Sequence, residues 1–125
     1  MDRNITVPLC DGPVSECIII ITVIDDAYGL RKKYGPMTTS VSCYAKRHGY
    51  GYMQVNPNKY NKNCHSMRDF FFKKHCAIHQ MMVTGALRKN AALLVLDGDI
   101  AAANVDSTLT KYLKDGADVV VYVYL

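Results

Sequence analysis

Apolar and polar positions fall into blocks along the chain, and the apolar blocks predict four β-strands. Residues 17–24 are an almost continuous β-branched run, and the lack of alternation in it is typical of a strand buried on both faces, as in a parallel sheet. The other expected strands are residues 50–55, the apolar run 91–96, and the β-branched and aromatic run 118–125.

The segments between these strands have helical patterns. Residues 36–47 begin with a proline at a first-turn position, and residues 66–83 supply apolar faces. A third helix is expected from about 106 to 114. Residues 1–16 are expected to be an irregular lead-in. The alternating order of strands and helices predicts one α/β three-layer domain over 17–125, with a mostly parallel sheet and right-handed crossovers.

Composition agrees with a soluble globular domain. The chain has 125 residues, of which 50% are hydrophobic and 21% are charged. The longest pure apolar run, residues 18–21, is far too short to cross a bilayer, and the N-terminus lacks the apolar region of a signal peptide. We therefore expect no membrane segment in this chain.

Positive charge is concentrated in the middle of the sequence. The net charge is +4, and between residues 28 and 90 the only acidic residue is Asp69. A basic middle flanked by acidic strand ends suits a phosphorylated ligand held by both cations and a metal. It also suits weak nucleic-acid binding or a solvated basic surface. We expect the phosphorylated ligand and no nucleic-acid partner.

Two acidic motifs follow predicted strands. Asp97-Gly98-Asp99 comes directly after the apolar run 91–96, and Asp25-Asp26 follows the first strand. Two carboxylates at a buried strand end repel each other unless a cation lies between them. Mn²⁺ and Mg²⁺ prefer such oxygen ligands and accept phosphate as a further one. The motif therefore predicts a metal site that holds a diphosphate, with an ordinary Asp-Gly turn as the alternative.

Placement in the sheet brings these motifs together. Ligands of open α/β sheets bind outside the carboxyl ends of the strands, so both motifs are expected on one rim. Tyr28, just after Asp25-Asp26, is well placed to stack on a base, with packing as the alternative.

Several segments together resemble a known family. They are residues 70–76 (FFFKKHC), 94–100 (LVLDGDI), Asn104, 111–113 (KYL) and 116–122 (GADVVVY). Over roughly residues 17–125 the chain looks like the nematode family of nucleotide-diphospho-sugar-transferase-like proteins, which are similar to the yeast-type galactosyl and mannosyl transferases of the Golgi. The resemblance implies a GT-A fold with a Rossmann-like nucleotide-binding half, a nucleotide-diphospho-sugar donor, Mn²⁺ (or Mg²⁺), a glycan or glycoprotein acceptor and the Golgi lumen.

The resemblance also implies residue roles. Asp99 would ligate the metal that bridges the diphosphate, and Asp97 would lie near the ribose and a metal-bound water. Asp25-Asp26 would meet the base and ribose. The basic helix with Lys73 or Lys74 would face the donor phosphates. Gly98, between the two acids, is included in the expected nucleotide-sugar site.

The chain departs from that family at a few positions. Val105 stands where the family has proline, and residues 123–125 lack the expected polar and aromatic pattern. A transmembrane anchor is also absent. We expect the acceptor-binding half to lie beyond residue 125, so the domain is interpreted as truncated at its C-terminus. The activity of this short chain is therefore left open.

Three other functions are alternatives to the glycosyltransferase. A strand ending in Asp-x-Asp also begins phosphatase-type domains, but there the motif normally lies on the first strand. The second alternative is a catalytically inactive paralogue that serves as a binding module or a relic. The third is a zinc site, although the spacing of its candidate ligands matches no standard finger; these are Cys64, His65, His75, Cys76 and His79.

The cysteines do not by themselves fix a pairing. Five cysteines allow at most two bridges and a free thiol. Cys17 and Cys43 lie in apolar segments and are expected to be small core residues.

Overall fold

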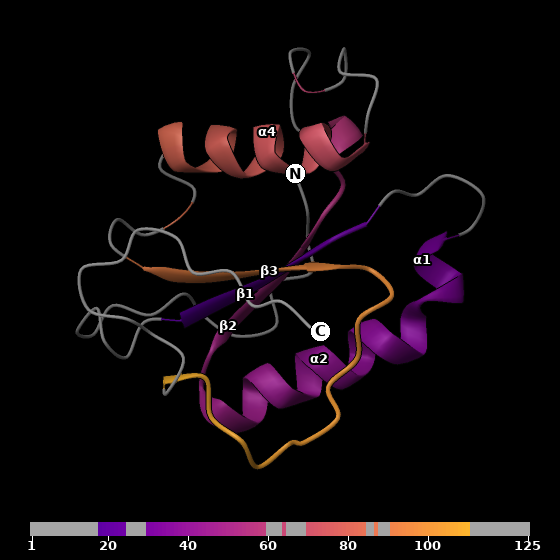
Figure 1. Ribbon diagram of the computed structural model, residues 1–125, viewed down its shortest axis with the longest axis vertical. Coiled ribbons are helices and arrows are strands. Elements are labelled where there is room, and N and C mark those ends of the chain that lie inside the picture. The colour runs from indigo at the N-terminus through magenta and orange to yellow at the C-terminus, as the bar shows by residue number, and fades with distance from the viewer. Residues whose placement is uncertain are drawn as a thin grey trace, which may run out of the picture.

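A computed structural model describes residues 18–24, 30–59, 64, 70–84, 87 and 91–110 (Figure 1). The predicted lead-in, most of the predicted third helix and the predicted last strand lie outside these residues. So do the acidic residues Asp25 and Asp26 and the neighbouring Tyr28.

Within the described residues, three parallel strands form a sheet. They are β1 (Ile18–Val23), β2 (Gly51–Val55) and β3 (Ala92–Asp97), in the order β2-β1-β3. The three predicted strands in this part of the chain are thus confirmed, with ends that shift by one residue or so. All six residues of β1 are buried, which confirms the interpretation of the β-branched run as a strand covered on both faces.

Helices cover both faces of the sheet, so the domain has three layers (Figure 1). Helix α4 (Phe70–Val83) packs on the face that carries Ile19, Ile21 and Val23. Helix α2 (Gly35–His48) packs on the opposite face, against Ile18 and Ile20. Since successive side chains of a strand point to opposite faces, β1 alone contributes to both cores. The short helices α1 (Leu30–Lys33) and η3 (Pro57–Lys59) precede α2 and follow β2.

The predicted start and stop of α2 are correct, and the residue types explain them. Pro36 lies in the first turn, where its missing N–H costs no hydrogen bond. Gly49 ends the helix with φ of 72°, a left-handed conformation that glycine adopts without steric cost. The Tyr50 N–H then donates to the Ala45 carbonyl at 2.9 Å, and β2 begins at the next residue.

The expected position of Cys43 in the core is wrong. It lies on α2 with its side chain exposed and its thiol free. The buried positions of α2 are Thr38, Val41, Tyr44 and Ala45. Cys43 follows the first of these by five residues, which places it on the solvent side of the helix.

The predicted helix from 106 is also wrong where the structure describes it. Residues 98–109 run back along α2 as turns and irregular chain (Figure 1). Their backbone groups bond to side chains: the Ala102 N–H donates to Ser40 Oγ at 3.0 Å, and the Leu109 N–H donates to the Tyr50 hydroxyl at 3.1 Å. Asn104 Oδ1 accepts from the Asp106 N–H at 3.2 Å, which favours a local turn over a helix start.

Within the described residues, no helix is both long enough and apolar enough to cross a membrane.

Candidate functional site

The Asp97-Gly98-Asp99 motif forms the turn that ends β3. Asp97 is the last residue of the strand and pairs in register with Val23 of the central strand. The Ile100 N–H donates to the Asp97 carbonyl at 3.2 Å and closes the turn. The turn interpretation is therefore correct for the backbone. It leaves open what the two carboxylates bind.

Gly98 lies where two strand ends pack closely together. A Cβ at this position would lie 3.0 Å from both Cγ1 and Cδ1 of Ile24, the residue that follows β1. That is closer than a carbon atom approaches a carbon atom without strain. The glycine thus lets the turn rest directly on the end of the central strand, beside the expected position of Asp25-Asp26 in the chain.

Asp97 forms an ion pair with Lys74 of helix α4. The Lys74 Nζ donates to Asp97 Oδ1 at 2.9 Å. Lys74 is only 9% exposed, whereas the Asp97 side chain is 58% exposed. The pair therefore has one buried and one open side, and the carboxylate is the open side.

Lys73 reaches the end of the other edge strand. Its Nζ donates to Asn58 Oδ1 at 2.9 Å, and Asn58 lies in η3, directly after β2. The first turns of α4 thus place adjacent lysines at the carboxyl ends of β2 and β3. Parallel sheets of this kind bind ligands at that edge. The structure joins Lys74 to Asp97, whereas Lys73 contacts the end of β2 on the other side of β1.

Asp99 differs from Asp97 in having no partner among the described residues. Its side chain is exposed, and no hydrogen bond or ion pair joins it to another residue in the described part of the chain. A carboxylate in this condition is available to a ligand from solution.

The donor set fits a hard divalent cation only in part. Among the described residues there is no cluster of three or more His, Cys, Asp or Glu side chains that would enclose a metal. Asp97 and Asp99 offer only oxygen atoms, the type that Mn²⁺ and Mg²⁺ prefer. Further ligands would have to come from water and from the phosphates of a substrate, as is common for Mg²⁺ sites.

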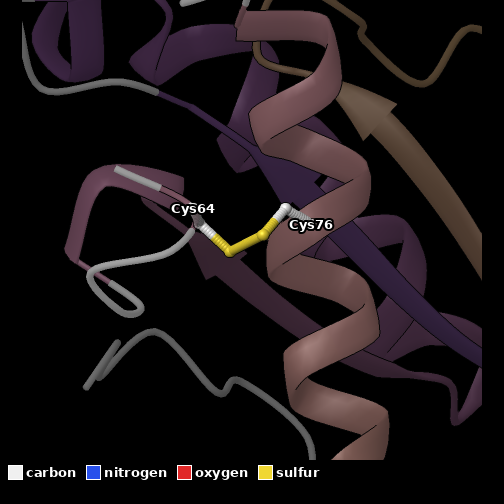
Figure 2. The surroundings of a disulfide bond; sticks show 2 residues. All are labelled: Cys64 and Cys76. Atoms are coloured by element: carbon white, nitrogen blue, oxygen red, sulfur yellow. A yellow bond between two sulfur atoms is a disulfide. The ribbon is translucent and has the colours of Figure 1, made fainter. Parts of the chain in front are cut away.

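A disulfide bond joins α4 to the segment between η3 and α4. Figure 2 shows Cys76 of the helix bridged to Cys64, with Cα atoms 5.4 Å apart. The sequence did not reveal this pairing. Because both thiols are in the bridge, they are not available as zinc ligands, and the zinc alternative loses two of its candidates. His75 and His79 lie on the exposed side of α4.

Sequence reasoning missed the direction in which Lys74 points. Lys74 precedes the buried residues Ala77, Ile78 and Met81 by three, four and seven positions, the spacing of one helix face. That spacing is the signal that placed this lysine against the sheet.

The family comparison covers most of this site. Residues 41–124 match a family described as "Protein of unknown function, DUF273". This span is more than half of the 125 residues. The chain belongs to that family. No curated protein and no solved structure matches it. The span that defines DUF273 membership includes Lys73, Lys74 and the Asp97-Gly98-Asp99 turn.

Proposed function

We propose that this chain is the nucleotide-sugar-binding part of a GT-A-like glycosyltransferase, which transfers a hexose from a nucleotide diphosphate to a glycan acceptor. The observation that carries the proposal is the pair of carboxylates at the carboxyl end of β3. Asp99 is exposed without a partner in the described part of the chain, and Asp97 stands beside it with an ion pair on one oxygen. A divalent metal between them would bind the donor diphosphate.

The fold supports this use of the edge. The acidic turn packs against Ile24, the residue that follows the central strand, at the rim where open α/β sheets bind ligands. Asp25, Asp26 and Tyr28 follow that strand in the sequence and are proposed to contact the nucleoside. Lys73, half-buried at the end of β2, is proposed to contact a donor phosphate.

In this proposal the acids bind the metal and the lysines balance the charge of the phosphates. When bound, the metal would act as a Lewis acid toward the leaving diphosphate. Asp99 and Asp97 would hold it through carboxylate oxygens. The lysines of α4 would offset negative charge on the phosphates, an effect that is strongest where the charged groups are already in place.

The disulfide bond supports an oxidising compartment as the location of this activity. Disulfides persist in oxidising environments such as the secretory pathway. The Cys64–Cys76 bridge agrees with the proposed location in the Golgi lumen.

One observation favours a second candidate, a non-catalytic binding module. The ammonium group of Lys74 already supplies a cation to Asp97. An inactive paralogue in which the turn is stabilised only by this pair would show the same contact. It would bind a nucleotide weakly or not at all, and it would not turn over a sugar donor.

Calorimetric titration with UDP and GDP, with and without Mn²⁺, tests the proposal. We expect binding that requires Mn²⁺, with a base preference that narrows the choice of sugar. Asp99→Ala should abolish this binding and leave the free energy of unfolding within about 0.5 kcal/mol of the parent, since the side chain is exposed and has no hydrogen bond or ion pair to a residue in the described part of the chain.

The matched control is Asp106→Ala. Asp106 is another exposed acid, in the segment after the turn, and it pairs with Arg47 rather than with the site. Its removal should leave nucleotide binding unchanged. Unaltered Mn²⁺-dependent binding in Asp99→Ala, or no binding by the folded parent chain, would overturn the proposal. Binding without hydrolysis or transfer of a nucleotide sugar would favour the module.

A further inference from the structure

Lys74 occupies a core position of α4 and carries its charge to the end of β3. The residues that share its helix face, Ala77, Ile78 and Met81, are buried against the sheet. An apolar residue would normally fill such a position. A lysine there is tolerated only if its ammonium group has a charged or polar partner, and Asp97 Oδ1 at 2.9 Å provides one.

The position of this ammonium group is fixed by its surroundings. One residue before it, Lys73 bonds to Asn58 at the end of β2. Two residues after it, Cys76 is bridged to Cys64. The first contact holds the start of α4 near the end of β2, and the ion pair with Asp97 together with the burial of Lys74 holds its ammonium group beside the acidic turn. A cation held in this way acts as a permanent part of the acidic site.

Charge balance then distinguishes two ligands. Within the acidic turn, Asp97 and Asp99 are the two carboxylates, and the ammonium group of Lys74 offsets part of their negative charge through its pair with Asp97. A free divalent cation would meet a site of reduced negative charge and a nearby like charge, which weakens its binding. A metal that arrives with a diphosphate brings its own negative oxygens, which the ammonium group attracts. Lys74 thus weakens binding of the free divalent cation and strengthens binding of the metal together with a diphosphate.

We propose that Lys74 makes metal binding at Asp97 and Asp99 conditional on the nucleotide diphosphate, so that metal and donor bind together and metal alone binds poorly. This inference rests on the proposed function. Lys74 acts here as a positioning and charge-balancing residue. The coupling is reciprocal, because each ligand must raise the affinity of the other by the same factor.

The test is to measure Mn²⁺ affinity with and without UDP or GDP, from the free Mn²⁺ signal in electron paramagnetic resonance. Lys74→Met has a similar length and suits the buried position; Lys74→Gln is a second variant that keeps a polar end. Thermal unfolding verifies that each is folded. In both we expect the affinity for Mn²⁺ alone to rise at least about tenfold, the order expected when one like charge is removed beside a divalent cation. The coupling factor should fall by at least as much.

Two further variants show where the effect arises. Lys46→Met removes a lysine from the exposed side of α2, on the opposite face of the sheet, and should leave both affinities unchanged. Adding Asp97→Asn to Lys74→Met should remove the gain in affinity for Mn²⁺ alone, because the gain depends on the released carboxylate. A merely structural role of Lys74 would lower all affinities together instead.

The outcomes separate this inference from the proposed function. If the parent chain binds nucleotide with Mn²⁺ but Lys74→Met and Lys74→Gln keep the same coupling factor, the role of Lys74 is refuted and the donor site stands. If the parent chain binds neither nucleotide in the presence of Mn²⁺, the proposed function fails and this inference fails with it.

Discussion

Removing the Cys64–Cys76 bridge is expected to destabilise the domain by an amount that follows from its loop length. The two cysteines are 12 residues apart. In the chain-entropy model, closing a loop of that size restricts the unfolded chain by about 3 kcal/mol at about 25 °C. At about 4 °C for each kcal/mol in a domain of this length, the loss corresponds to a fall of about 12 °C in Tm.

The clean perturbation is the double variant Cys64→Ala/Cys76→Ala. A single substitution would leave a reactive thiol on the remaining cysteine. Alanine is preferable to serine because Cys64 is fully buried, and a hydroxyl group there would need a hydrogen-bond partner.

The assay is urea and thermal unfolding followed by circular dichroism, with Cys43→Ala as the control. Cys43 is an exposed free thiol on α2, so its removal should change the unfolding free energy by less than about 0.5 kcal/mol. A loss below about 1 kcal/mol in the double variant would refute the loop-closure reasoning. It would mean that contacts of α4 persist in the unfolded chain and already restrict this segment there.

Two more substitutions test other parts of the structure. Gly98→Ala should destabilise the domain by about 1–3 kcal/mol, because its Cβ would lie 3.0 Å from Ile24 side-chain atoms. Ile24→Val removes the Cδ1 contact and should recover part of this loss in a double-mutant cycle. Strictly additive effects of the two substitutions would count against this contact. Arg47→Ala should lower the free energy of unfolding in urea by less than about 0.5 kcal/mol, because Arg47 and its partner Asp106 are both largely exposed. A larger loss would show that the pair helps to hold the 98–109 segment on α2.

The parallel sheet could be predicted from the sequence because its signals are local. The β-branched run of β1 indicates burial on both faces, and the acids that follow β1 and β3 indicate one edge. The proline at the start of α2 and the glycine after it set its limits. For the same reason the position of Asp97-Gly98-Asp99 at the end of a strand was correct.

The features that were predicted wrongly or missed from the sequence depend on contacts between distant segments. Residues 98–109 are held by side chains of α2 and by Tyr50, and these partners are more than fifty residues away in the chain. The partner of Cys64 and the direction of Lys74 depend on how α4 lies on the sheet. A lysine in a buried helix stripe contradicts the usual polar pattern. Only the spacing to Ala77, Ile78 and Met81 indicates it.

The strand order has a consequence for how this family should be delimited. The match to DUF273 begins at residue 41, whereas β1 ends at Val23 and lies between β2 and β3. Of the strands that the structure describes, the matched span therefore contains β2 and β3, which pair with β1 and not with each other. A protein cut at residue 41 would lose the middle of its sheet, and both remaining strands would have unpaired edges open to aggregation. The boundary of sequence similarity is therefore not a boundary at which this domain can fold.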